Sequence, residues 1–388
     1  MDVRAGAPQE AELQRLIGRL RSSDVTVRSD AAHALGKLQD ERGAEALVGA
    51  LEDPDEYVRK SAVLALRRIG GTRALEGLRV ALGDRSEQVC LQAIRGVGEL
   101  RDRSAVEALI KGLSRRERSL QHAAIEALSR IGSDAVRPLM EAFKDRQLRR
   151  RIGNQILKIL IDIGPRAVDP LLEVLGDESP YVRMTAVSVL GRIGDRRVVA
   201  PLVGLFLEDP RLQEAVVTTL TQLEDRGAIG GDGAHVDREV ALPRAVLEAL
   251  QAHGRDRSME SLRVALGHES PKVRRFACKA VHGLAGEEAS QLLLHVLQDE
   301  DVEVKRLVVK LLGKLRDKRV IDPLLELILK DGEQVEEAVW NTIKVLTDLR
   351  EYEELRARVG KQRAGGRPQV RQYKKERDLS PDWWREQD

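Results

Sequence analysis

The chain has 388 residues and a formal net charge of only +2, although 33% of its residues are charged, so bulk charge selects no class of partner. Aromatic residues make up 3%, which is low for a globular core and leaves the burial to alanine and the aliphatic residues. No stretch approaches 18 apolar residues, and the N-terminal residues lack the apolar region of a secretion signal, which predicts a cytoplasmic protein without membrane insertion.

A Val-Arg step recurs along the chain with a nearly fixed period. It starts at Val27-Arg28 and returns after 31 residues at Val58-Arg59. The anchors of the step, which are weaker in the middle of the chain and 30 to 32 residues apart, are Val27, Val58, Val89, Leu120, Ile152, Val182, Leu212, Leu242, Val273, Val304 and Val335. Eleven repeats of this length predict a solenoid, which offers an extended surface for holding other molecules.

The second repeat shows how each one is built. Residues 44–51 form a first helix, and the turn at 52–56 ends it, because Pro54 lacks an N–H group and biases the preceding residue away from helical geometry. Asp55 is placed to cap a second helix, whose inward face reads Val58, Ala62, Ala65, Leu66 and Ile69. No segment alternates polar and apolar residues, so the sequence predicts an all-α protein.

Two further positions recur in the second helices. Four residues after the anchor most repeats carry alanine, at Ala31, Ala62, Ala93, Ala124, Ala186 and Ala277. Eight residues after it all carry an aliphatic residue, namely Leu35, Leu66, Val97, Leu128, Leu160, Leu190, Leu220, Leu250, Val281, Leu312 and Ile343. Small positions beside large ones allow neighbouring helices to interdigitate.

The stretches DPDEYVRKSAVLALRRIG and DESPYVRMTAVSVLGRIGD resemble the HEAT-like repeats, in particular the short class found in bilin lyases and many prokaryotic scaffolds. The resemblance covers residues 10–359, which leaves a flexible N-terminus at 1–9. It implies a right-handed α-solenoid of about eleven two-helix repeats, with the second helices lining its concave face. It specifies the fold and hardly the function; an Arg- and Ala-rich composition favours a prokaryotic source.

An arginine follows the anchor in four repeats, at Arg28, Arg59, Arg183 and Arg274, with acidic residues a few positions earlier. A ladder of this kind either binds a ligand or joins the repeats internally. We favour the internal role, in which each arginine bonds to carboxylates and carbonyls of the turns, because ion-pair networks are a common structural device.

Catalytic and metal-binding patterns are absent from the sequence. His268-Glu269 is the single His-Glu pair, whereas deoxyhypusine hydroxylases, which share the repeat, use several such pairs to hold a di-iron centre. Histidines and cysteines show no metal-ligand spacing, and no phosphate-binding or nucleophile motif occurs. Cys90 and Cys278 lie too many repeats apart to pair, which fits a reducing compartment. We therefore predict no catalytic residue, metal or cofactor.

Most turns inside the repeats are acidic, but the two at 114–118 and 144–151 are basic. Stacking of repeats places them side by side, at the N-termini of two second helices, where cations oppose the helix dipole. Such an edge suits phosphate or a carboxylate-rich partner, and a solvated charge run is the alternative. This basic edge consists of Arg115, Arg116, Arg149, Arg150 and Arg151.

The eighth repeat is irregular. Residues Gly227–Asp237, rich in glycine, make a full first helix improbable over 227–240. We interpret the segment as a degenerate repeat rather than a loop that presents Asp232 and His235 to a partner. Trp340, in the last repeat, is predicted to pack in the core.

Basic residues also gather on the solvent side of the later second helices. This cationic patch consists of Arg275, Lys279, Arg306, Lys310, Lys314 and Lys344, interrupted by Glu337. It suits an acidic protein segment or nucleic acid. Only Phe276 lies near it as an aromatic residue, which argues against binding of single strands by base stacking.

The segment 360–388 is a basic tail that ends in a pair of tryptophans. Lys374 and Lys375 lie in its basic part, and Trp383 and Trp384 lie near its end behind Ser380-Pro381. Tryptophans anchor interfaces, so the tail is predicted to dock on a partner, and burial of both indoles on the chain's own array is the alternative.

Together these features predict a non-catalytic adaptor that binds protein partners through its array and its tail. A nucleic-acid-binding protein that uses the same basic residues is the first alternative. A bilin lyase or lyase chaperone, implied by the family resemblance, is the second.

Overall fold

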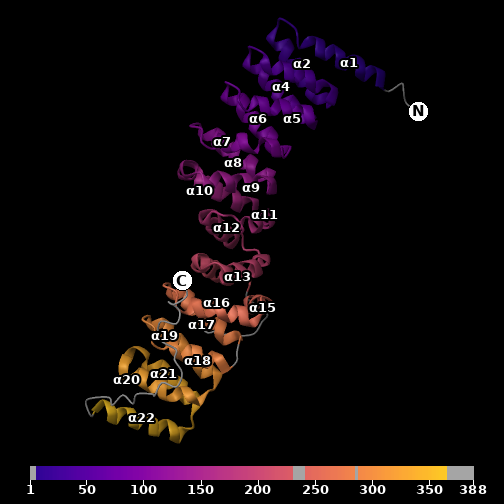
Figure 1. Cartoon of the computed structure of the whole chain (residues 1–388). Helices are drawn as coiled ribbons and strands as arrows, with labels where there is room; N and C mark the ends of the chain where they lie inside the picture. Colours follow the sequence, from indigo (N-terminus) through magenta and orange to yellow (C-terminus); the bar gives the residue numbers. More distant parts are fainter. Residues whose placement is uncertain (1–5, 230–240, 285–286, 365–388) are drawn as a thin grey trace. The chain divides into compact units, whose positions relative to one another are not determined.

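The computed structural model (Figure 1) describes residues 6–229, 241–284 and 287–364, which form helices and short 3-10 turns throughout. The chain divides into an N-terminal half, Met1–Ile193, and a C-terminal half, Gly194–Asp388. No strand occurs in these described ranges, so the all-α prediction is confirmed. Within them, no helix is both long and apolar enough to cross a membrane.

In the N-terminal half, helices alternate between a first and a second helix of each repeat. The first helices are α1 (Gly6–Arg19), α3 (Ala44–Gly49), α5 (Gly71–Ala81), α7 (Val106–Gly112), α9 (Ser133–Lys144) and α11 (Val168–Val174). The second helices are α2 (Val25–Leu38), α4 (Glu56–Ile69), α6 (Glu87–Glu99), α8 (Arg118–Ile131), α10 (Arg146–Ile163) and α12 (Pro180–Ile193). The 3-10 turns are η1 (Glu41–Gly43), η2 (Ala50–Glu52), η3 (Arg103–Ala105) and η4 (Gly164–Ala167).

The C-terminal half continues the alternation with one irregular helix. Its first helices are α13 (Val199–Glu208), α16 (Arg255–Leu266), α18 (Glu287–Val296) and α20 (Ile321–Asp331), and its second helices are α14 (Gln213–Asp225), α17 (Pro271–Leu284), α19 (Val302–Leu315) and α21 (Glu333–Leu346). The irregular helix is α15 (Arg244–Ala252), a last helix is α22 (Leu349–Ala364), and the 3-10 turns are η5 (Arg196–Val198), η6 (Pro210–Leu212) and η7 (Lys318–Val320). Helical structure thus begins before residue 10 and continues past Val359.

The recurring apolar positions form the core. From Val58 onward every anchor is buried, as are all the alanines four residues later and all the aliphatic residues eight residues later. Two close approaches depend on glycine. A Cβ on Gly36 of α2 would lie 2.7 Å from the Cα of Ala65 on α4, and Gly98 of α6 stands in the same relation to Ala127 on α8. Any larger residue there would push the second helices apart.

The arginine ladder joins consecutive repeats. Three of the four ladder arginines reach an aspartate in the turn of the next repeat, with Nε–Oδ2 distances of 2.7 Å for Arg28–Asp53, 2.9 Å for Arg59–Asp84 and 2.7 Å for Arg274–Asp299. A second donor of each guanidinium bonds to two carbonyls of its own turn, as Arg59 does with Asp53 and Pro54 at 2.9 and 3.1 Å. The internal role predicted for this ladder is confirmed for these three arginines.

The ladder is expected to make the stability of the fold depend on pH in the acidic range. Burial opposes ionisation of Asp53, but the hydrogen bonds from Arg28 and from the Asp55 backbone N–H outweigh it and lower the pKa of that carboxyl below 3.8. A lowered pKa adds stability that is present above the ordinary pKa and is lost as the pH falls through the lowered one. We expect the thermal midpoint to fall steeply below pH 3.8. The same titration followed on Arg28→Gln should show a shallower fall, and an identical slope would contradict this cause.

Candidate binding site

The row of second helices is interrupted at the eighth repeat. α15 does not take the place predicted for a second helix: it packs mainly on α13, and α14 packs directly on α17. His253 at the end of α15 closes against Gly204 of α13, where an added Cβ would meet the imidazole at 2.9 Å. Phe206 of α13 and Phe276 of α17 bring their ring centroids to 4.9 Å. Residues 230–240, where the weak first helix is predicted, lie outside the described residues.

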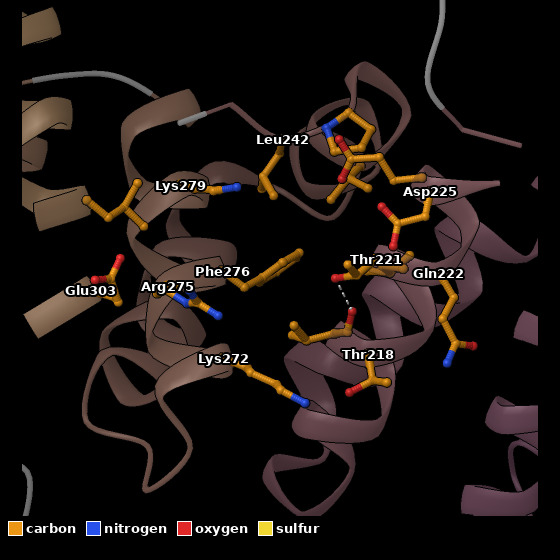
Figure 2. A pocket seen from close by; sticks show the side chains of 16 residues that line it. Thr218, Thr221, Gln222, Asp225, Leu242, Lys272, Arg275, Phe276, Lys279 and Glu303 are labelled. Atoms are coloured by element: carbon orange, nitrogen blue, oxygen red, sulfur yellow. Dashed lines mark hydrogen bonds between the residues drawn. The ribbon is translucent and has the colours of Figure 1, made fainter. Parts of the chain in front are cut away.

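This interruption leaves a cavity of about 460 Å³ between α14, α17 and α19 (Figure 2). Its floor is apolar, with Phe276 at the centre, and α17 contributes three cations that follow one another along the helix. The lining residues are Val217, Thr218, Leu220, Thr221, Gln222, Glu224 and Asp225 of α14, Leu242, Pro243 and Val246 before and in α15, Lys272, Arg275, Phe276 and Lys279 of α17, and Glu303 and Leu307 of α19. We call this site the cavity.

The cations on α17 differ sharply from their ladder neighbour. Arg274 is buried and bonded to Asp299 on the inner side of the helix. Arg275 and Lys272 are exposed beside the cavity, and neither forms a hydrogen bond or ion pair with any residue that the structure describes. A guanidinium and an ammonium group held next to an apolar floor suit a ligand that combines carboxylates with apolar groups.

Two observations concern metal-binding groups and thiols. The described residues contain no group of three His, Cys, Asp or Glu side chains that would hold a metal ion. The two cysteines, Cys90 and Cys278, are free and buried, and burial raises the pKa of the Cys278 thiol to about 12, which keeps it protonated and a poor nucleophile. The cavity itself offers groups for ion pairing, hydrogen bonding and apolar burial.

The remainder of the cationic patch lies on α19 and α21. Arg306 is engaged locally, because it donates to the Glu303 carboxylate at 2.8 Å and to the Gln334 carbonyl at 2.8 Å. Lys310 is half-buried, and Lys314 and Lys344 are exposed. Burial, aided by the charge of Lys314, lowers the pKa of His282 on α17. The patch therefore spans three successive second helices, and Arg275 and Lys279 are its members in the cavity.

The first residue of the basic edge has a structural role. Cys90 takes the ladder position of α6, and Arg115 takes the place of the aspartate that would pair with an arginine there. Arg115 reverses the ladder, since it donates to Cys90 Sγ at 3.2 Å and to the Leu82 carbonyl at 3.0 Å. Its guanidinium thus bonds inward, and a role of Arg115 in partner binding stays a prediction.

The other members of the basic edge are either bonded to neighbouring groups of the protein or exposed without such bonds to the described residues, and Arg151 is both bonded and exposed. Arg149 is half-buried, donates to the Phe143 carbonyl at 3.0 Å and lies 5.0 Å from the ring centroid of Tyr181. Arg151 donates to the Ser114 carbonyl at 3.2 Å, which confirms that the two basic turns are adjacent. Arg116 and Arg150 are exposed. Arg151 is exposed as well, so these three are the accessible cations of the edge.

The remaining predicted residues are Trp340 and those of the C-terminal tail. Trp340 on α21 is half-buried, packs edge-on against Tyr352 of α22 with centroids 5.6 Å apart, and bonds to Glu336 at 3.2 Å. Lys374, Lys375, Trp383 and Trp384 of the predicted tail lie outside the described residues.

Lys272 is the cation of the cavity that the sequence analysis missed. It lies one residue before the Val273 anchor, where the repeat pattern assigns no direction to a side chain. The signal that would have found it is the irregular eighth repeat, because loss of a second helix from the row uncovers the first turn of α17.

A sequence profile for HEAT repeats matches residues 13–92, 78–157, 145–221, 232–304 and 259–344. The chain belongs to the HEAT-repeat family. Two curated relatives are the alpha subunits of phycocyanobilin lyases from Picosynechococcus sp. PCC 7002 and Nostoc sp. PCC 7120, which are 31% and 29% identical over 39% and 38% of this HEAT-repeat chain. The chain spans 64% and 62% of the length of these two relatives.

Two solved structures are similar to the chain at low sequence identity. An engineered protein is 18% identical with a TM-score of 0.38, over 87% of this chain and 99% of its own. The complex of CpcE and CpcF of phycocyanin lyase from Nostoc sp. PCC 7120 is 22% identical with a TM-score of 0.32, over 62% of this chain and 92% of its own. Likeness at this level bears on no function.

Proposed function

We propose that this HEAT-repeat protein is a non-catalytic scaffold of the cytoplasm, and that its C-terminal half binds an acidic, partly apolar segment of a protein partner at the cavity. The observation that carries the proposal is the pair of exposed cations, Lys272 and Arg275, beside the buried ring of Phe276. Solenoid proteins use extended helix faces as binding surfaces, and here the interruption of the row adds a hollow for an anchoring side chain.

The composition of the walls favours a peptide over nucleic acid. Asp225 of α14 faces the α17 cations across the cavity, whereas Glu303 of α19 lies on their own side beside Arg275. This mixed lining disfavours a continuous run of phosphates more than a segment whose carboxylates are spaced apart. The cavity also offers threonine hydroxyls, at Thr218 and Thr221, as further hydrogen-bonding groups. Exposed aromatic rings for base stacking are missing from its described lining.

The test is binding of a labelled peptide rich in Glu, Asp and Leu to the full chain, followed by fluorescence anisotropy. We expect Arg275→Glu to weaken binding about tenfold or more, which is about 1.4 kcal/mol. Arg211→Glu serves as the matched control, because Arg211 is an exposed arginine of the same half that does not line the cavity. Equal binding by both variants would reject the site.

A nucleic-acid role gives a different pattern in a parallel titration with double-stranded DNA. Its affinity should fall steeply with salt, and it should depend on Arg116 and Arg150 of the basic edge rather than on Arg275. Binding of DNA that is lost in Arg116→Glu and Arg150→Glu and survives Arg275→Glu would support that alternative instead.

A second candidate function is action on a tetrapyrrole, as a lyase subunit or a lyase chaperone. The similarity to alpha subunits of phycocyanobilin lyases favours it. Mixing the full chain with phycocyanobilin tests it directly, because a bound chromophore changes its visible absorption band. An unchanged band at saturating protein would reject the chromophore as a ligand.

A further inference from the structure

The C-terminal end of the last described helix lies against the start of a second helix. Arg363 of α22 pairs with Glu336 in the first turn of α21 at 3.1 Å and donates to the Ile328 carbonyl of α20 at 3.4 Å. Lys272 and Arg275 lie in the first turn and a half of α17, at the corresponding end of that helix. The chain therefore leaves α22 at the N-terminal edge of the second-helix row, which is the edge where the cations of the cavity stand.

The remaining chain is long enough to reach the cavity. α21 packs on α19 and α19 packs on α17, so the path along the edge crosses two interhelical steps of about 10 Å, or about 20 Å. The 18 residues from 365 to Asp382 span up to about 60 Å when extended. Length places no limit on the contact.

The charges of the remaining chain are opposite in sign to the charges along this edge, and they change sign in the same order. The first turns of α19 and α21 are acidic, with Glu303, Glu333 and Glu337 all exposed. Residues 365–377, which follow α22 in the sequence, carry five basic residues and one acidic residue. The last segment, 378–388, reverses to four acidic residues and one basic residue, and it is the part that would arrive at Lys272 and Arg275.

We propose that the cavity binds the chain's own C-terminal segment, residues 378–388, in an intramolecular contact. One indole of the Trp383-Trp384 pair packs over Phe276, and carboxylates of the same segment pair with Lys272 and Arg275. The proposal rests on the proposed function, because it assigns an occupant to the same site. It makes the segment a tethered competitor of the acidic partner, held at an effective concentration in the millimolar range.

Tryptophan emission of the full chain tests this contact. In a Trp340→Phe background all emission comes from Trp383 and Trp384, because the chain has three tryptophans. We expect emission shifted to shorter wavelength than that of a free peptide of residues 378–388, and a return to the peptide's wavelength in Arg275→Glu but not in the control Arg211→Glu. Emission equal to the free peptide's before any cavity substitution would overturn the proposal, as would a shift that grows with protein concentration, which marks exchange between chains.

A competition experiment separates this inference from the proposed function. The full chain carrying Trp383→Ser and Trp384→Ser is expected to bind the acidic peptide about tenfold more tightly than the unchanged chain, since its tethered competitor is weakened. Unchanged affinity would overturn the intramolecular contact and leave the binding site standing. Failure of both chains to bind any acidic peptide, with the emission shift intact, would remove the proposed function and keep the tail contact.

Discussion

Replacement of Arg59 by alanine is expected to lower the free energy of unfolding by about 3–5 kcal/mol, because it leaves a buried carboxylate without its partner. The side chains of Arg59 and Asp84 are 5% and 8% exposed, so water replaces little of the lost interaction. The substitution also removes the donors to the Asp53 and Pro54 carbonyls. Each of these losses falls at the junction between the second and third repeats.

Denaturant unfolding followed by circular dichroism measures the effect, and hydrogen exchange locates it. Protection should be lost first in α4 and α6, since stability in a solenoid is a sum of local and neighbour terms. Arg95→Ala is the matched control: Arg95 is an exposed arginine of α6 without a partner among the described residues. A loss of less than about 1 kcal/mol in Arg59→Ala would be comparable with that of a surface ion pair. It would show that the ladder contributes little to the free energy of unfolding.

The repeat could be predicted from the sequence because the same positions are buried in every copy of it. An anchor such as Val58, an alanine such as Ala62 and an aliphatic residue such as Leu66 recur at fixed offsets and are all fully buried. The ladder was predictable for the same reason, since an arginine beside the anchor meets the same acidic turn each time. Residues that repeat have the same environment in each copy, so one interpretation serves them all.

The cavity was not predictable in this way, because it exists where the repeat fails. The sequence predicted a weak eighth repeat, but spacing alone does not show that α15 joins α13 and leaves α14 against α17. Arg275 and Lys279 were identified as cations of the solvent side, without the hollow between them. The paired substitution of Cys90 and Arg115 was also hidden, since a sequence shows an arginine in a turn and not which atoms it reaches.

That pair permits a sharp test of the ladder by restoring it. Arg115→Asp alone should cost about 1–3 kcal/mol, because it removes one of the two donors to the Leu82 carbonyl and places a part-buried carboxylate beside the Cys90 thiol. Cys90→Arg alone should cost a similar amount, because two guanidinium groups then compete for one space. Together, the changes recreate the Arg59–Asp84 arrangement one repeat further along.

The double variant is therefore expected to be more stable than either single variant, with a coupling energy of about 2–3 kcal/mol between the two positions. A double-mutant cycle of unfolding free energies measures it, with the exposed pair Arg95→Ala and Arg116→Asp as a control cycle that should be additive. If the losses of unfolding free energy at Cys90 and Arg115 are additive, the two side chains do not depend on each other. The packing around α6 and α8 would then determine which residues are tolerated at these positions. A favourable coupling would show instead that Arg115 compensates for a missing ladder arginine, which leaves Arg116, Arg150 and Arg151 as the accessible cations of this edge.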